Sequence, residues 1–299
     1  MADTLWVAQA SPTKGSNPSI KQDSSPPASN AVAVWLMDGG TVSQAGNLGA
    51  IASAWSVIGQ RDFNGDGYSD LLWRDASGDL AMWLMNGQTV ASAASLGSIP
   101  ATWTVNGTGD LNGDGKGDIL WRDSAGDVVI WFMNGSAVSS TASLGNVPTN
   151  WSIAGDDNNG NIYWRDTAGD VAVWQVAGPQ VVASVGLGNV PTSWTIAGFG
   201  DFDGDGNVDI LWRDNSGDVA IWFLNGNGGV ASTASLGTLP TTWTVGQTGD
   251  YNGDSMSDIL WIDSSGDLAI WFMNGATVAS TASLGNVGTA WQVQSANAE

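Results

Sequence analysis

Four short segments rich in aspartate and asparagine recur along the chain, and their residue types suit metal binding. They read DFNGDGYSD, DLNGDGKGD, DFDGDGNVD and DYNGDSMSD, at residues 62–70, 110–118, 201–209 and 250–258. Side chains with oxygen atoms stand at positions one, three, five and nine of each segment. Calcium takes roughly six to eight oxygen ligands, and a backbone carbonyl at position seven would add to these four. The spacing therefore predicts a calcium loop in each segment.

The candidate calcium ligands occupy the same four positions in each loop. They are Asp62, Asn64, Asp66 and Asp70; Asp110, Asn112, Asp114 and Asp118; Asp201, Asp203, Asp205 and Asp209; and Asp250, Asn252, Asp254 and Asp258. Glycines at positions four and six would let the backbone curl around an ion. An EF-hand loop would require a Glu at position twelve and flanking helices, which these segments lack. Ordinary turns, which also favour Asp, Asn and Gly, are the alternative interpretation.

A fifth segment, DDNNGNIYW at residues 156–164, is shorter and lacks the aspartates of positions five and nine. We expect this segment to bind calcium weakly or not at all. The sequence thus predicts about four calcium ions. Their role would be structural, because without them the loop carboxylates would repel one another, so that binding stabilises the fold by linkage.

These loops belong to a unit that repeats about every 48 residues along the chain. Fifteen of the 18 Trp residues form five matching triplets, and Trp6, Trp35 and Trp55 form a sixth. Each unit holds four short segments rich in Val, Ile, Trp and Phe, separated by Gly, Asn, Asp and Ser turns. Four strands per repeat at this spacing are typical of a propeller blade. We therefore predict an all-β, six-bladed β-propeller of four-stranded blades.

The repeat phase also predicts how the ring closes. The chain starts at the second strand of a repeat, near Trp6, and ends after a first strand, near Trp291. Pairing of these N- and C-terminal strands, TLWV beside TAWQV, would complete the first blade and leave no sheet edge at the seam. An open solenoid, or a five-bladed ring with a loose tail, is the alternative.

The repeats cover the whole chain, so residues 1–299 are interpreted as one propeller domain. Residues 10–30 are rich in Pro, Ser and Asn and break the pattern, which indicates an insert or flexible loop within the first blade. In the alternative interpretation, residues 1–30 form a disordered leader and Trp6 matches the repeat by chance.

Composition excludes several classes of function. The chain has 29 Asp and Glu against eight Lys and Arg, a net charge of −21, which argues against nucleic acid as a partner. It has no Cys and no His, so disulfides, thiol catalysis, histidine-based triads and the usual zinc sites are excluded. No apolar run is long enough to insert into a membrane, and the first residues lack the pattern of a signal peptide.

The segment DFNGDGYSDLLW and its copies resemble the FG-GAP or VCBS repeat of integrin α-subunit propellers, bacterial surface proteins and a fungal propeller lectin. The resemblance covers nearly the whole chain apart from the insert. It implies calcium at the sixteen loop residues given above. The departures are Ser255 in place of a glycine and the shortened fifth segment. Because calcium sites of extracellular modules fill at roughly 10⁻⁴ to 10⁻³ M, we expect the protein to be secreted or displayed on the cell surface.

A second recurring turn, RDxxGD, carries side chains that could bind sugars. Aromatic faces pack against sugar C–H groups, while carboxylate and guanidinium groups reach the hydroxyls. The candidate ligand-binding residues are Arg74, Asp75 and Trp103; Arg122, Asp123 and Trp151; Arg165, Asp166 and Trp194; and Arg213, Asp214 and Trp243. In the alternative interpretation each Arg pairs with an Asp across its hairpin and the Trp side chains fill the space between blades.

Repeated sites without a catalytic group favour a multivalent carbohydrate-binding protein, a lectin, with glycans or glycoconjugates as partners. The alternative is a protein-binding adhesion module of the integrin propeller kind, with one large patch. We do not expect an enzyme and predict no catalytic residue. A glycan-cleaving propeller needs an acid and a base in different environments, and the chain has a single Glu, Glu299.

Overall fold

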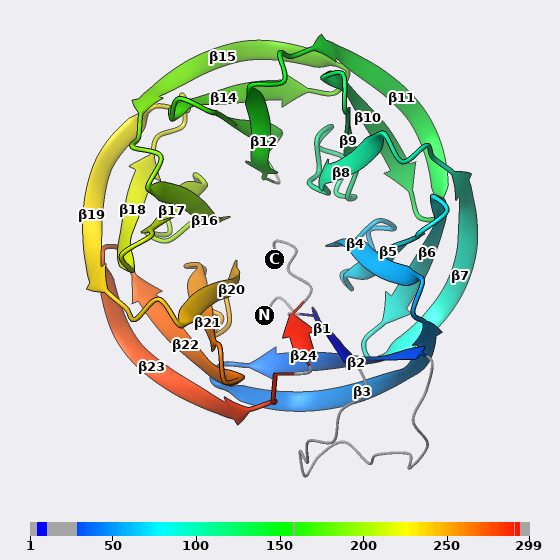
Figure 1. Ribbon diagram of the computed structural model, residues 1–299, viewed down its shortest axis with the longest axis horizontal. Coiled ribbons are helices and arrows are strands. Elements are labelled where there is room, and N and C mark those ends of the chain that lie inside the picture. The colour runs from blue at the N-terminus through cyan, green and yellow to red at the C-terminus, as the bar shows by residue number, and fades with distance from the viewer. Residues whose placement is uncertain (1–4, 11–28, 158, 290, 294–299) are drawn as a thin grey trace.

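The computed structural model describes residues 5–10, 29–157, 159–289 and 291–293. Within these ranges the strands form six four-stranded sheets, in which hydrogen-bonded neighbours run antiparallel. The sheets surround a central axis, with the first strand of each sheet innermost and the fourth outermost (Figure 1). The prediction of an all-β propeller built from four-stranded blades is therefore confirmed. A search of the same residues found no helix long and apolar enough to cross a membrane.

Five sheets consist of consecutive strands. Sheet 2 contains β4 (Trp55–Arg61), β5 (Asp70–Asp75), β6 (Asp79–Asn86) and β7 (Thr89–Ser98). Sheet 3 contains β8 (Trp103–Gly107), β9 (Ile119–Asp123), β10 (Asp127–Asn134) and β11 (Ala137–Asn146). Sheet 4 contains β12 (Trp151–Asp156), β13 (Asn161–Asp166), β14 (Asp170–Ala177) and β15 (Gln180–Asn189). Sheet 5 contains β16 (Trp194–Gly200), β17 (Asp209–Asp214), β18 (Asp218–Leu224) and β19 (Val230–Thr238). Sheet 6 contains β20 (Trp243–Gly249), β21 (Asp258–Asp263), β22 (Asp267–Asn274) and β23 (Thr277–Asn286).

Sheet 1 combines strands from both ends of the chain. Its order is β24 (Trp291–Val293), β1 (Leu5–Ala10), β2 (Ser29–Asp38) and β3 (Thr41–Ala52). The register places Ala8 opposite Val293 and Ala10 opposite Trp291, so the terminal strands pair just after TLWV and not along it. The five other sheets are complete blades, and the predicted number of six is reached only by counting this composite sheet. Of the expected insert at residues 10–30, residues 11–28 lie outside the described residues.

Sheet 1 also packs against sheet 6, which precedes β24 in the chain. Met37 of β2 packs in one buried cluster with Tyr251, Leu260 and Ile270 of sheet 6. The backbone N–H of Gly39 donates a hydrogen bond to the carbonyl of Tyr251, at 2.7 Å. The two ends of the repeat array are therefore joined by side-chain packing as well as by the pairing of β24 with β1.

The core lies between neighbouring sheets, because the second and third strands carry large apolar residues on both faces. On β9, Ile119, Leu120 and Trp121 are all buried. Ile119 and Trp121 pack with residues of sheet 2, whereas Leu120 packs with residues of sheet 4. In sheets 2 to 6 the Trp of the second strand lies against the Trp of the third strand, as for Trp121 and Trp131, whose ring centroids are 5.2 Å apart. For these tryptophans the core interpretation is confirmed.

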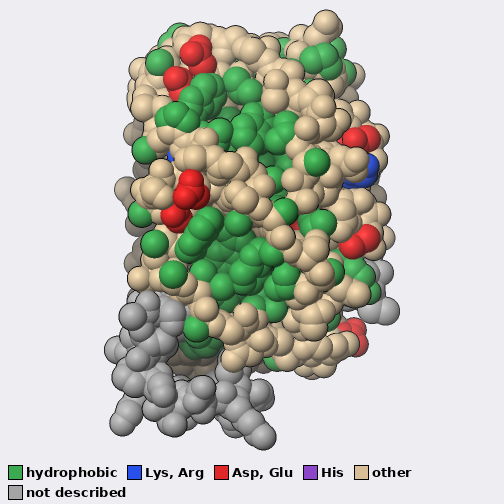
Figure 2. All heavy atoms as spheres, turned by 90° about the vertical axis from the view of Figure 1, so that its right-hand side faces the viewer, with side chains coloured by type: hydrophobic (Ala, Val, Ile, Leu, Met, Phe, Trp, Pro, Cys, Tyr) green, Lys and Arg blue, Asp and Glu red, His purple; other side chains and the backbone are tan. Residues whose placement is uncertain are grey.

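The outermost strands present small, uncharged side chains to the solvent. The sequences of β7 and β11 are TVASAASLGS and AVSSTASLGN. On the side of the ring that carries these strands, apolar side chains gather in patches with acidic side chains beside them (Figure 2). Val90 and Val138, at equivalent places on β7 and β11, are among the exposed large apolar residues.

Candidate functional site

Each of the four aspartate loops connects the first strand of its sheet to the second. The first Asp of the loop accepts hydrogen bonds from backbone N–H groups of the same loop. In sheet 3, Asp110 Oδ1 accepts a hydrogen bond from the N–H of Gly113 at 2.7 Å, and Asp110 Oδ2 accepts one from Gly115 at 2.8 Å. Both glycines have a positive φ, of 76° and 80°. The first aspartates of the other three loops, Asp62, Asp201 and Asp250, make the same two bonds.

The fourth loop keeps this shape although it has Ser255 in place of the second glycine. Ser255 adopts a φ of 68°, and it is the only non-glycine residue with a positive φ among those described. Its backbone N–H donates to Asp250 Oδ2 at 2.9 Å, as Gly115 does to Asp110. Serine in this left-handed region carries a steric cost that glycine avoids. This cost makes the fourth loop the most strained of the four, but does not change its geometry.

The last Asp of each loop is a buried anchor. Asp70 is fully buried, and its carboxylate accepts hydrogen bonds from the N–H groups of Phe63 at 2.9 Å and of Met85 on β6 at 2.8 Å. Burial, together with the negative charges of Asp62 and Asp66, raises the pKa of Asp70 to about 7, although the two hydrogen bonds oppose this rise. The equivalent carboxyls are buried in the same way and their pKa values are also raised to about 7: Asp118, Asp209 and Asp258.

Three carboxylates converge in the loop of sheet 5, whereas the loop of sheet 3 also carries Lys116, whose Nζ donates to Asn134 Oδ1 at 2.9 Å. Oxygen atoms of Asp201, Asp203 and Asp209 all lie within 4.8 Å of one another. Burial, followed by the charge of Asp205, raises the pKa of Asp203. A hard cation coordinated by oxygen would remove this repulsion, so the donor set fits calcium. Among the described residues, carboxylates converge this closely only in the loop of sheet 5, while in each of the other three loops the four predicted residues lie in or at the end of the same connection between two strands.

Each aspartate loop is also bonded to the next sheet around the ring. The carbonyl of Phe63 accepts a hydrogen bond from Gly135, in the hairpin of sheet 3, at 2.7 Å. Leu111 is bonded in the same way to Gly178 of sheet 4, and Phe202 to Gly275 of sheet 6. A second bond joins the N–H of Gly117 to the carbonyl of Asp62, at 2.7 Å. The conformation of each aspartate loop therefore determines hydrogen bonds between its own sheet and the next one.

The shortened loop of sheet 4 is held by hydrogen-bond donors. Asp157 is buried, and its carboxylate accepts from the amide Nδ2 of Asn161 at 2.8 Å and from the hydroxyl of Tyr163 at 3.0 Å. Asn161 stands where the other loops have the buried Asp, and Tyr163 stands where they have Leu. Asn158, within this loop, lies outside the described residues. The donors satisfy the carboxylate, which supports the prediction of a weak or empty site.

A second buried carboxylate in sheet 4, Asp156, faces the neighbouring sheets. It accepts a hydrogen bond from the backbone N–H of Gly109 in sheet 3. Burial raises the pKa of Asp156 to about 6, while the positive charge of Arg61 from sheet 2 opposes this rise. Asp156 thus belongs to the contacts between inner strands and not to a loop that could hold an ion.

The Arg side chains proposed for ligand binding bridge neighbouring sheets. Arg74 donates to the carbonyl oxygens of Trp103 at 2.5 Å, Ile99 at 2.8 Å and Pro100 at 2.9 Å. Its guanidinium carbon lies 6.0 Å from the ring centroid of Trp121, on the next sheet. Arg122, Arg165 and Arg213 lie in the same way over Trp164, Trp212 and Trp261. Sequence reasoning missed this role, because the acceptors are backbone atoms about 25 residues further along the chain.

The Asp side chains of the RDxxGD turns shape the turns themselves. Asp75 Oδ1 accepts hydrogen bonds from the N–H groups of Ser77 and Asp79, both at 2.9 Å. The equivalent carboxylates of Asp123, Asp166 and Asp214 accept the same two bonds. In the part of the chain that the structure describes, no ion pair joins the Arg and Asp of one turn, so the expected Arg–Asp pairing across the hairpin is not seen.

The four candidate Trp residues of these junctions are half-buried. Each begins the first strand of its sheet and packs at the edge of a core cluster: Trp103, Trp151, Trp194 and Trp243. Because Arg74, Arg122 and Arg165 bond the carbonyls of Trp103, Trp151 and Trp194, the backbone of these three tryptophans is fixed from the preceding sheet. The Trp and Arg residues thus meet, but through the Trp backbone.

Comparison with known families identifies the repeat. The sequence pattern described as the FG-GAP-like repeat matches residues 62–121 and 201–261. Each match begins at the first Asp of an aspartate loop and ends in the following sheet, at the buried Trp of its second strand. No curated protein sequence matches the chain. The chain therefore carries FG-GAP-like repeats on a β-propeller.

Solved structures with low sequence identity are similar to the chain to different degrees. The Tc holotoxin pore of Photorhabdus luminescens has a TM-score of 0.51 and 15% identity, over 90% of this chain and 15% of the other. Raptor of Chaetomium thermophilum has a TM-score of 0.48 and 10% identity, over 83% of this chain and 23% of the other. A protein of unknown function from Bacteroides caccae has a TM-score of 0.43 and 12% identity, over 94% of both chains. The chain spans less than a quarter of the first two.

Proposed function

We propose that this FG-GAP-repeat β-propeller is a calcium-stabilised carbohydrate-binding module. Its four aspartate loops would each hold one structural calcium ion. The convergence of the carboxylates of Asp201, Asp203 and Asp209 within 4.8 Å supports the metal site. Because each loop is bonded to the hairpin of the next sheet, the ions would stabilise the junctions between sheets. Free calcium at the concentration outside cells would fill such loops, which favours a secreted or surface-displayed protein.

The observation that carries the carbohydrate proposal is the recurrence of a half-buried indole at one place in successive junctions. Trp103, Trp151 and Trp194 begin equivalent strands, and a guanidinium from the preceding sheet fixes the backbone of each. An indole held in place offers a flat apolar face to a sugar ring without loss of side-chain freedom on binding. Repetition of such a face would give multivalent binding.

A protein-binding adhesion module is the second candidate, and the internal hydrogen bonds of the Arg side chains favour it. Because Arg74, Arg122 and Arg165 already bind backbone carbonyls, their guanidinium groups are less available to sugar hydroxyls. A lectin would then bind sugars mainly through indoles and carboxylates. A propeller that used its surface for a protein partner would not need repeated pockets at all.

A glycan array, read with calcium and with a chelator, separates the two candidates. We expect a lectin to bind a defined set of glycans when calcium is present. Chelation should abolish this binding together with the native near-ultraviolet circular dichroism, because the ions would support the fold and not the sugar. A calcium-loaded protein that binds no glycan but binds a protein ligand would replace the lectin by the adhesion module.

A further inference from the structure

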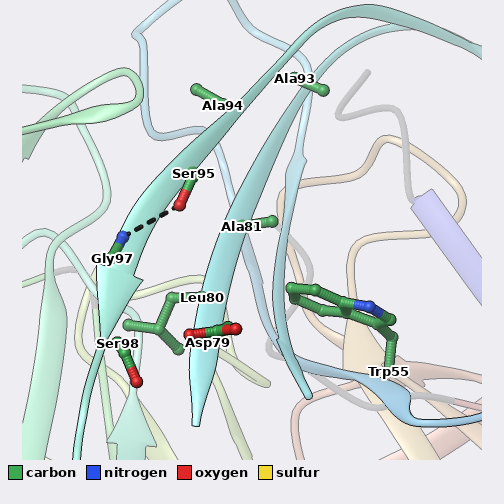
Figure 3. Close-up of a pocket in the computed structure, with 9 residues that line it drawn as sticks. All are labelled: Trp55, Asp79, Leu80, Ala81, Ala93, Ala94, Ser95, Gly97 and Ser98. Atoms are coloured by element: carbon green, nitrogen blue, oxygen red, sulfur yellow. Dashed lines mark hydrogen bonds between the residues drawn. The ribbon is translucent and has the colours of Figure 1, made fainter. Parts of the chain in front are cut away.

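Sheet 2 has a surface pocket of about 630 Å³ that combines an indole, a carboxylate and hydroxyl groups. Trp55 of β4 lies on one side of it, Asp79 and Ala81 of β6 lie in the middle, and residues of β7 including Ala93 and Ser95 lie on the other side (Figure 3). The volume is within the range of pockets that bind small molecules, roughly 300 to 1,000 Å³. None of these residues belongs to the calcium loops or to the RDxx part of the turns.

The carboxylate in this pocket differs from its equivalents in the other sheets. In sheets 3, 4 and 6 the matching Asp accepts a hydrogen bond from an Asn side chain at 2.8 to 2.9 Å: Asp127 from Asn146, Asp170 from Asn189, and Asp267 from Asn286. In sheet 5, Asp218 accepts one from the hydroxyl of Thr238. In sheet 2 the residue at this place is Ser98, and within the described residues no hydrogen bond reaches the side chain of Asp79, which is exposed.

The pocket also has a smaller side chain at a second place. The residue opposite the Trp of the third strand is Ala93 in sheet 2, whereas it is Thr in sheets 3, 5 and 6 and Ser in sheet 4. Sheet 6 has the same residues as the pocket at the equivalent positions, with two exceptions. Thr281 replaces Ala93, and Asn286 replaces Ser98. Two substitutions therefore distinguish the pocket from its equivalent in sheet 6.

We propose that the pocket between Trp55 and Asp79 is the principal sugar site of this protein and takes an uncharged pyranose. The indole and the methyl groups of Ala81 and Ala93 would face the C–H side of the ring. Asp79 would accept hydrogen bonds from two hydroxyls, since a carboxylate is a strong acceptor and none of the described residues donates to this one. Ser95 Oγ accepts from the N–H of Gly97 at 3.2 Å, which leaves its own hydrogen free to donate.

The negative charge of the protein and of the pocket favours an uncharged sugar over an acidic one. The net charge of −21 and the carboxylate in the pocket disfavour sialic acids and uronic acids, which are themselves anionic. A neutral hexose or N-acetylhexosamine presents both an apolar face and adjacent hydroxyls, as the pocket requires. This inference rests on the proposed function, because it assigns the strongest sugar site of the lectin to one junction.

The test is calorimetric titration of the calcium-loaded protein with methyl mannoside, methyl galactoside and N-acetylglucosamine. We expect one of these sugars to bind with a stoichiometry of one strong site. The double variant Ala93→Thr/Ser98→Asn copies sheet 6, so the fold should be retained. It should weaken binding at least about tenfold, which corresponds to the loss of about 1.4 kcal/mol.

The reverse exchange provides the matched gain-of-function variant. Thr281→Ala/Asn286→Ser gives sheet 6 the residues of sheet 2 and should raise the number of strong sites from one to two. Unchanged affinity in the Ala93→Thr/Ser98→Asn variant, with sugar binding intact, would overturn the pocket assignment and leave the proposed function standing. Absence of binding of every sugar to the calcium-loaded wild type, on the array as in the calorimeter, would overturn both. Tight binding of arginine amide in place of sugars would show a cation site and would also overturn the pocket assignment.

Discussion

The loops of sheets 3 and 4 occupy the same place in consecutive repeats but stabilise a buried carboxylate by different means. In sheet 3, the buried Asp118 accepts hydrogen bonds from two backbone N–H groups and, at 3.5 Å, from Nδ2 of Asn112. The charges of Asp114 and Asp110 repel it. In sheet 4, the side chains of Asn161 and Tyr163 donate directly to Asp157. The two loops therefore surround a buried carboxylate with different groups, and we propose a cation only for the loop of sheet 3.

The change in sheet 4 is compensated in the backbone as well. In sheet 3 the carboxylate of Asp118 accepts the N–H of Met133, which ties the loop to the third strand. In sheet 4 the carbonyl of Gly160 accepts the equivalent N–H, from Val176, at 2.6 Å. Loss of the carboxylate thus leaves no donor of this strand unpaired. We expect calcium dependence to be confined to sheets 2, 3, 5 and 6, and the predictions below test this division.

Removal of calcium from the whole protein should have the largest effect. At about 10 mM calcium, which is a hundred times a Kd of about 10⁻⁴ M, each bound ion adds about 2.7 kcal/mol to the folded state. Since 1 kcal/mol shifts Tm by roughly 2–4 °C in a domain of this size, loss of four ions should lower Tm by at least about 20 °C. Differential scanning calorimetry with calcium and with chelator measures this, and metal analysis should find four ions per chain. Six ions, or none, would contradict the division between the loops.

Acid should reduce the calcium effect. Without an ion, burial raises the pKa of Asp70, Asp118, Asp209 and Asp258 from 3.8 to about 7. Their ionisation costs more in the folded state than in the unfolded state, so the stability of the metal-free protein should fall as the pH rises from about 4 to about 7. Calcium reverses this cost, so its stabilisation should be largest near pH 8 and small near pH 5. Thermal unfolding across this range, with and without calcium, provides the measurement.

The absence of His and Cys makes this pH test selective, because no unperturbed side chain of the chain titrates between about pH 5 and 8. Asp156, whose pKa burial raises to about 6, should contribute a change of the same sign that calcium does not affect. The Asp156→Asn variant removes this contribution and is the control. A calcium effect of equal size at both ends of the range would contradict the role of the four buried carboxyls.

Removal of two ligands from one loop should cost one ion. The variant Asn64→Ala/Asp66→Ala removes two predicted ligands and one negative charge. It leaves the bonds of Asp70 Oδ2 to the N–H of Phe63 and of Asp70 Oδ1 to the N–H of Met85 in place. In about 10 mM calcium it should lose up to about 2.7 kcal/mol of stability and bind three ions. In chelator the sign should reverse, since repulsion within the loop is relieved. Asn112→Ala/Asp114→Ala in sheet 3 should behave in the same way, and a loss of stability in chelator for either variant would argue against an electrostatic origin.

Much of this architecture could be predicted from the sequence, because it depends on spacing within one repeat. The aspartate loops, the four strands per unit and the pairing of the two terminal strands all follow from residues that recur at fixed distances. The shortened segment at residues 156–164 also indicated a different loop in sheet 4. The extra donors could have been found there, since Tyr163 replaces a Leu and Asn161 replaces an Asp of the other repeats.

Contacts between sheets could not be predicted in the same way. Arg74 follows a buried Trp directly in sequence, yet its partners are carbonyls of the connection to the next sheet and the ring of Trp121. Pattern within a repeat does not show which backbone atoms of the neighbouring repeat lie nearby. For the same reason the sequence did not predict that Asp79 differs from its equivalents. In sheets 3 and 6 an Asn side chain donates to the matching Asp, whereas none of the described residues donates to the carboxylate of Asp79.

The smallest effect is expected from removal of one donor in sheet 4. Tyr163→Phe deletes the hydroxyl that donates to Asp157 at 3.0 Å and leaves the buried carboxylate with fewer partners. The cost should be about 1–3 kcal/mol. It should be the same in calcium and in chelator, because no ion is expected at this loop. Tyr68→Phe, at position seven of the loop in sheet 2, is the matched control and should be neutral, since within the described residues no hydrogen bond involves the Tyr68 hydroxyl. If the cost of Tyr163→Phe disappears on chelation, the loop of sheet 4 binds calcium after all and the contrast with sheet 3 is lost.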